Sequence, residues 1–190
     1  SIDQTFTGDF KSSLVHDCWA SHFNTNALAH QICTAHLLRD LNYLNELYSH
    51  KWGKAVKLLL QIALNLEKQM SIQDYYNHNP RRQQVEKRME FLLDFNLPPG
   101  KKELVRFQRR LKKHRDHIFT FLYRPEVPPD NNASERAIRN IKVKQKVSGL
   151  FRSAKGAHNF AVLRSITDTA LKNQQNVLDS LKLIANLQTD

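Results

Sequence analysis

The spacing of apolar residues predicts a short β-rich start followed by a mostly helical chain. A brief apolar run leads through His16 to Asp17, and a second run spans residues 30–34; both have the length of a strand. From residue 41 to residue 121, apolar residues recur every three or four positions, which predicts four helices. The apolar positions are Leu41, Leu44, Leu47 and Tyr48, then Val56, Leu59, Leu60, Ala63 and Leu66, then Val85, Met89, Leu92 and Leu93, and finally Leu104, Phe107, Leu111, Ile118 and Leu122. The fourth helix should stop before Pro125.

Three further helices are predicted in the last third of the chain. Residues 128–132 read Pro-Pro-Asp-Asn-Asn, which favours a helix start capped by a side chain between Asp130 and Asn132. A helix from about Ala154 should break at residues 173–176, and a last helix should open at Asn176 and end near Leu187. These last two helices suggest packing elements.

Composition indicates a globular protein with an anionic partner. The chain has 190 residues and a net charge of +11, and residues 76–125 carry 13 basic but only 5 acidic side chains. Its two cysteines form no zinc-type pair or disulfide framework, which fits a reducing cytosol. The sequence shows no signal peptide and no apolar run long enough to span a bilayer, so we expect no membrane partner.

One carboxylate, Glu135, stands at the start of a strongly cationic segment. No acidic residue interrupts the basic residues that follow it, which are Arg136, Arg139, Lys142, Lys144, Lys146, Arg152 and Lys155. This arrangement suits phosphate chemistry, in which a carboxylate holds a hard metal ion and the cations hold a nucleic-acid backbone. The alternative is a capped helix with a solvated basic face, in which Arg139 pairs with Glu135.

Three other features each have two interpretations. Asp17 ends a strand, where parallel-sheet proteins place ligand-binding residues, or it caps a helix beginning near Trp19. Cys33 and His36 form half of a metal site or, as we favour, a buried thiol and a hydrogen-bonded histidine. The fourth helix carries a dense basic face, which is either solvated or in contact with phosphates. That face comprises Lys101, Lys102, Arg106, Arg109, Arg110, Lys112, Lys113 and Arg115.

Several motifs resemble one family. DNNASERAIRNIKVKQKVSGLFRS at 130–153, SITDTALKNQQNVLDSL at 165–181, CTAHLLRDL at 33–41 and the pattern GDF-x-x-x-LVHD-x-W at 8–19 are similar to bacterial DDE transposases of the insertion-sequence-sixty-six family. The resemblance implies an α/β, mostly helical fold with a partial ribonuclease-H-like catalytic core. Residues 1–49 would form part of that core, residues 50–125 a helical insertion, and residues 126–190 the rest of the core with the glutamate helix.

The resemblance also implies a catalytic site. Asp17 matches the second catalytic carboxylate of the family and Glu135 the third, and together they would hold Mg²⁺ or Mn²⁺ for in-line displacement at phosphorus. Asp3 and Asp9 lie too close to Asp17 in sequence to supply the first carboxylate. We therefore expect this chain to be a C-terminal part of the catalytic domain, inactive by itself.

The implied partners are the DNA of transposon ends and target, and further copies of the protein in a synaptic complex. The location would be the bacterial cytoplasm, at the chromosome. The expected DNA-binding residues are Arg136, Arg139, Lys142, Lys144, Lys146 and Arg152. Two alternatives stay open: a non-catalytic basic module for DNA binding or assembly, and a structure-specific nuclease on the same fold.

Overall fold

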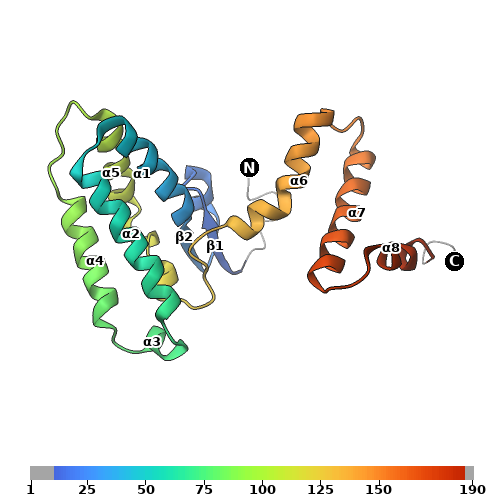
Figure 1. The fold of residues 1–190 in the computed structure, drawn as a ribbon, viewed down its shortest axis with the longest axis horizontal. Helices are drawn as coiled ribbons and strands as arrows, with labels where there is room; N and C mark the ends of the chain where they lie inside the picture. The colour runs from blue at the N-terminus through green and yellow to red at the C-terminus, as the bar shows by residue number, and fades with distance from the viewer. Residues whose placement is uncertain (1–10, 187–190) are drawn as a thin grey trace. The chain divides into compact units, whose positions relative to one another are not determined.

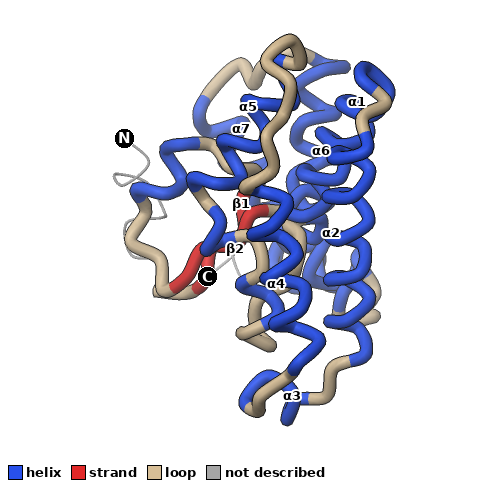
Figure 2. The backbone as a smooth tube through the Cα atoms, turned by 90° about the vertical axis from the view of Figure 1, so that its left-hand side faces the viewer, coloured by secondary structure: helices blue, strands red, loops and turns tan. Residues whose placement is uncertain are grey.

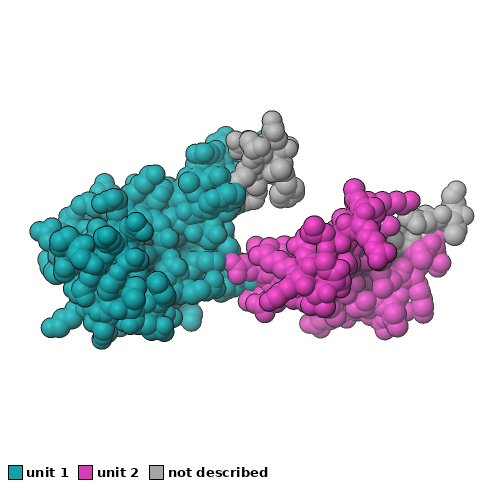
Figure 3. Space-filling model, turned by 90° about the horizontal axis from the view of Figure 1, so that it is seen from above, with its two compact units in different colours: residues 1–132 teal, residues 133–190 magenta. Residues whose placement is uncertain are grey.

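The computed structural model describes residues 11–186, apart from the side chains of residues 137, 140 and 184. Asp3, Asp9 and the predicted helix end near Leu187 lie outside the described residues. The chain divides into two compact units, residues 1–132 and residues 133–190 (Figure 3). The expected division of the first 125 residues into a core part and an insertion stays a prediction.

The first unit contains a parallel pair of short strands, β1 (Ser13–His16) and β2 (Ala29–Ile32). Ser13 is opposite Ala29 and His16 is opposite Ile32, so both strands end at the same edge. A short 3-10 helix, η3 (Ala20–Asn24), belongs to the crossover between them. The two predicted strands are therefore confirmed. Figure 2 shows how small this sheet is beside the helices.

Helices α1 (Thr34–Tyr48), α2 (Lys51–Gln69), α3 (Ile72–Tyr76), α4 (Pro80–Leu93) and α5 (Lys102–Lys113) make up most of the first unit (Figure 1). Their core contains nearly all of the predicted apolar positions; Leu47, which is 49% exposed, is the clear exception. None of the helices within residues 11–186 is long and apolar enough to cross a membrane.

Capping explains where several of these helices begin. Asn79 accepts hydrogen bonds from the backbone N–H groups of Arg81 and Arg82, and Pro80 occupies the first turn of α4, where its missing N–H costs nothing. Ser71 and Asp74 form a capping box on α3. Arg82 itself is 8% exposed, and its guanidinium donates to backbone carbonyls that include Asn77 O (3.0 Å) and Leu122 O (3.1 Å). It thereby ties the start of α4 to a distant segment.

The predicted fourth helix is too long. It ends at Lys113 and is followed by two 3-10 turns, η4 (Arg115–His117) and η5 (Thr120–Leu122). The physical reason is Gln31 of β2, which is fully buried. Its side-chain amide donates to Ile118 O (2.9 Å) and accepts from Phe121 N–H (3.0 Å), groups that a continuous helix would have paired internally.

The second unit consists of α6 (Asn132–Ser148), whose first residue belongs to the first unit, α7 (Ala154–Lys172) and α8 (Val177–Asn186). Gly149 has φ +71°, the left-handed conformation that commonly follows a helix end. Ser153 caps α7 by accepting from Gly156 N–H (3.0 Å), and Asn176 caps α8 by accepting from Leu178 N–H (2.9 Å). The predicted helix starts near residues 154 and 176 are thus confirmed.

Candidate active site and nucleic-acid interface

Asp17 lies directly beyond the carboxyl end of β1. The backbone turns sharply after it, since Cys18 has φ +69°. The strand itself is anchored to its neighbour because Cys33 N–H donates to His16 O (2.7 Å). The Asp17 side chain is 50% exposed, so the sheet presents a carboxylate to solvent at the edge where both strands end.

The Asp17 carboxylate has two local partners. It accepts a hydrogen bond from Trp19 N–H at 3.3 Å, and it lies 3.4 Å from His22 Nδ1. The predicted alternative, a cap on a helix near Trp19, is only partly met, because the element there is the 3-10 helix η3, and the residue at its cap position, Trp19, makes no side-chain capping bond. The hydrogen bond from Trp19 N–H orients the Asp17 carboxylate, whereas His22 Nδ1 is near it without a hydrogen bond, and half of the Asp17 side chain stays exposed.

Sequence reasoning missed a cluster of aromatic and histidine rings behind Asp17. His16, 3% exposed, packs edge-on against Phe23 with ring centroids 4.5 Å apart, and Phe23 stacks on His114 at 3.9 Å. His16 Nδ1 accepts from Cys18 N–H, so a neutral His16 carries its proton on Nε2 and donates to His30 Nδ1 at 3.3 Å. No short sequence motif predicts this cluster, because its members come from four separate places in the chain: β1, η3, β2 and the end of α5.

Burial controls the ionisation of this cluster. Burial, reinforced by the neighbouring His22 and His30, lowers the pKa of His16 to about 4, against a small opposing effect of Asp17. Burial also lowers the pKa of His30 and of His114. The buried His16 is therefore neutral at physiological pH and supports the end of β1 without adding charge next to Asp17.

A positive environment reaches this end of β1 from α5. Burial raises the pKa of the Cys18 thiol, and the positive charges of Arg110 and Lys113 oppose that rise. Arg110 also forms a short ion pair with Asp40 of α1. The last turn of α5 therefore lies beside the segment that carries Asp17.

Glu135 lies in the first turn of α6 and is half-buried. The predicted start of this helix is confirmed, because the Asp130 carboxylate accepts from Asn132 N–H at 3.0 Å. Asn131, in the same turn, has a buried Oδ1 without a hydrogen-bond partner among the described residues. Glu135 belongs to the second unit and Asp17 to the first, so their separation stays a prediction.

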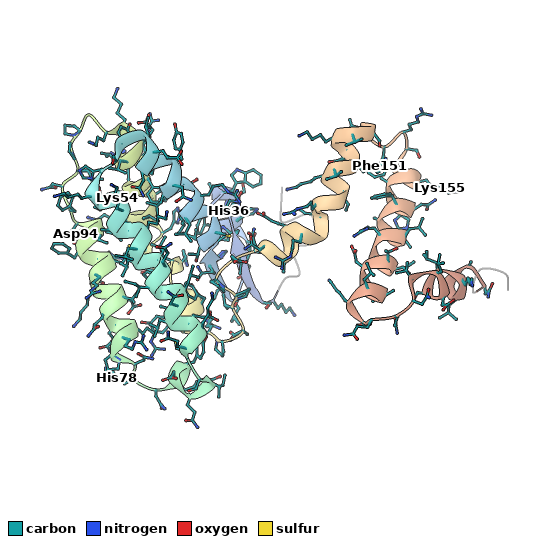
Figure 4. All side chains as sticks on the ribbon, in the orientation of Figure 1. His36, Lys54, His78, Asp94, Phe151 and Lys155 are labelled. Atoms are coloured by element: carbon teal, nitrogen blue, oxygen red, sulfur yellow. The ribbon has the colours of Figure 1, made fainter. Side chains whose placement is uncertain are left out.

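The expected DNA-binding residues fall into two groups. Five of them are exposed on the second unit: Arg136, Arg139, Lys142, Lys146 and Arg152. Lys144 differs, because it is half-buried and its Nζ lies 4.1 Å from the centre of the Phe151 ring and 5.7 Å from that of Phe160. Figure 4 shows Phe151 and Lys155 at the connection between α6 and α7. Lys144 thus has a structural contact within its unit.

Within residues 11–186, no group of three or more His, Cys, Asp or Glu side chains is placed to hold a metal ion. The favoured interpretation of Cys33 as a buried thiol is confirmed, since Cys33 is fully buried. His36 lies in the first turn of α1 (Figure 4). Asp17, an accessible carboxylate with hard oxygen donors, suits Mg²⁺ or Mn²⁺ as one ligand among several.

The first unit contains a parallel strand pair with a solvent-facing Asp at its carboxyl edge, and helices follow this pair in the chain. The basic helix α6 has a half-buried Glu in its first turn. These features define the class of an α/β protein whose acidic site candidates lie far apart in sequence. Residues 1–159 match the sequence profile described as "Transposase IS66 family". The chain belongs to this family.

One curated relative is similar over a shorter stretch. It is the "Uncharacterized protein y4jO" of Sinorhizobium fredii (strain NBRC 101917 / NGR234), which is 36% identical over 62 residues. The match covers 33% of this chain and spans about a fifth (19%) of the length of that relative. No solved structure matches the chain.

Proposed function

We propose that this chain is part of the catalytic domain of a DDE transposase and supplies two of its carboxylates, Asp17 and Glu135. The reaction would be metal-dependent cleavage of DNA and strand transfer during insertion-sequence transposition. The observation that carries the proposal is that a family match across residues 1–159 includes both a strand-end Asp17 in an accessible position and the capped start of the Glu135 helix. β1 and β2 would be two strands of a ribonuclease-H-like core.

Asp17 and Glu135 would hold Mg²⁺ or Mn²⁺. Such ions activate a water or a 3′-hydroxyl for attack at phosphorus and stabilise the leaving oxygen. Asp17 is suited to the role because the hydrogen bond from Trp19 N–H orients its carboxylate while half of the side chain stays exposed. In the working enzyme, the two carboxylates should lie within about 10 Å, because paired ions are themselves roughly 4 Å apart.

The exposed cations of the second unit would contact DNA at transposon ends and target. Arg136, Arg139, Lys142, Lys146 and Arg152 have the charge and the exposure for phosphate contacts, which set position and affinity more than sequence. The working form would be a homo-oligomer on paired DNA ends.

The test is a cleavage and strand-transfer assay with the complete gene product, transposon-end DNA and Mg²⁺ or Mn²⁺. Asp17→Asn and Glu135→Gln should each abolish both steps while leaving DNA binding intact, because each swap keeps shape and removes the charge that holds the metal. Matched controls are Asp116→Asn and Glu90→Gln at exposed positions, which should retain activity. Cleavage that survives both substitutions would refute the assignment, and cleavage without strand joining would indicate a nuclease.

A further inference from the structure

Helix α5 has a buried apolar side and an exposed cationic side. Leu104, Phe107 and Leu111 are at most 5% exposed and face the core of the first unit. Along the opposite side, the residues at intervals of four, three and four positions are all basic and all exposed: Lys102, Arg106, Arg109 and Lys113. This spacing places the four side chains in one row, here called the α5 stripe. At 1.5 Å per residue, the stripe is about 16 Å long.

The charges of the α5 stripe are not consumed by ion pairs. Other cations of this region have partners: Arg110 pairs with Asp40, Lys112 with Asp94 at 2.7 Å, and Arg115 with Asp116 at 3.6 Å. Within the part of the chain that the structure describes, none of the ion pairs involves a stripe residue. Figure 4 shows Asp94 at the end of α4, where its carboxylate accepts a hydrogen bond from Lys112. The hydrogen bond from Tyr48 is the largest cause of the lowered pKa of the Glu103 carboxyl on the same helix, and the nearby charges of Arg106 and Lys102 help to lower it. The stripe therefore presents a row of positive charge that one carboxylate near its start offsets only in part.

The last member of the stripe lies next in sequence to a residue that packs near the carboxyl end of β1, where Asp17 stands. Lys113 is its last member, and the next residue, His114, stacks its ring on Phe23 at 3.9 Å with an interplanar angle of 12°. Phe23 in turn packs on His16, the residue before Asp17. These contacts all lie in the first unit, so Asp17 and the stripe are held in one compact body.

We propose that the α5 stripe binds the phosphate backbone of the DNA whose scissile bond is presented to Asp17. A row of about 16 Å is as long as about five base-pair steps of duplex DNA, at 3.4 Å per step along the helix axis. Unpaired cations at helical spacing suit such a linear anion, whereas a compact anion would need converging donors. The proposal rests on the proposed function for its orientation toward Asp17, and it adds a DNA-binding surface on a different unit from the α6 cations.

The experiment measures binding of the 190-residue chain to a fluorescent 30-base-pair duplex between 50 and 200 mM salt. The test variant is Arg106→Gln/Arg109→Gln/Lys113→Gln. The control is Lys54→Gln/Lys87→Gln/Arg88→Gln, which removes the same charge from exposed positions on α2 and α4 of the same unit; Figure 4 shows Lys54 on α2. Two unrelated duplex sequences are used, since phosphate contacts are indifferent to sequence.

Each lost phosphate contact lowers the slope of log affinity against log salt by about 0.9, so the test variant should lose up to about 2.7 of slope. Wild type should then lose about 40-fold more affinity than the test variant over this fourfold salt range. The control should keep the wild-type slope. Arg109→Gln alone should lower the slope by about 0.9 and gives the same answer if the triple variant is poorly folded.

An unchanged slope in the α5 variants, an equal fall in the control, or no DNA binding at 50 mM salt would each overturn the proposal. These outcomes differ from failure of the proposed function, which is judged by cleavage. Loss of cleavage in Asp17→Asn, with α5 variants that bind DNA like wild type, would retain the catalytic assignment and reject the stripe.

Discussion

Gln31 joins the small sheet to the segment after α5. Replacing this residue should therefore lower the urea concentration at which the first unit unfolds. The side chain is fully buried and serves Ile118 O and Phe121 N–H, two backbone groups about 90 residues away in sequence. Gln31→Met keeps the length of the side chain but leaves both groups buried and unpaired. At about 1–3 kcal/mol for each group, the free energy of unfolding should fall by about 4 kcal/mol.

The measurement is equilibrium unfolding in urea, monitored by tryptophan fluorescence. Both tryptophans, Trp19 and Trp52, belong to the first unit, so the signal reports that unit alone. With a slope of about 2 kcal/mol per molar urea, the midpoint should fall by about 2 M. The control Gln84→Met, at an exposed position on α4, should change stability by less than about 0.5 kcal/mol. A midpoint shift below about 0.5 M for Gln31→Met would show that the bridge does not hold this segment.

Three further predictions concern charge. In the folded chain the pKa of His16 is lowered from 6.5 to about 4, so the unfolded chain binds this proton more readily between these pH values. The free energy of unfolding should therefore be highest above pH 6.5 and fall by about 3 kcal/mol as the pH drops toward 4. An equal pH dependence of the free energy of unfolding in wild type and His16→Asn would contradict this. Arg82→Lys should cost about 2–4 kcal/mol in urea unfolding, because a lysine cannot reach the carbonyls that the guanidinium joins, whereas the exposed Arg81→Lys should cost about 0.5 or less. Lys142→Gln should weaken DNA binding without altering the midpoint of thermal unfolding, because this side chain is exposed. Lys144→Gln should weaken DNA binding and also lower that midpoint, because it removes the contact with the Phe151 ring. Identical behaviour of the two variants would refute this contact.

Local features of the chain could be predicted from the sequence because the groups that cause them are neighbours. The caps at Asp130 and Asn176 each depend on a side chain within three residues of the backbone N–H group that it binds, and the strand that ends before Asp17 follows from a short apolar run. The helices of the first unit follow from apolar spacing, since one face of each must be buried. Residue types and motifs also led to Asp17 and Glu135, whose shared role in metal binding stays a prediction.

The tertiary structure alone decided features whose partners are far apart in sequence. Periodicity extended the fourth helix through Leu122, but the helix ends at Lys113, and Gln31 binds the backbone of Ile118 and Phe121 in the segment that follows. The basic face of the same helix was ambiguous until the structure separated paired cations such as Arg110 from the stripe that ends at Lys113. Hydrogen bonds and ion pairs between residues 18 to 90 positions apart leave no periodic trace in sequence, and only folding brings those groups within bonding distance.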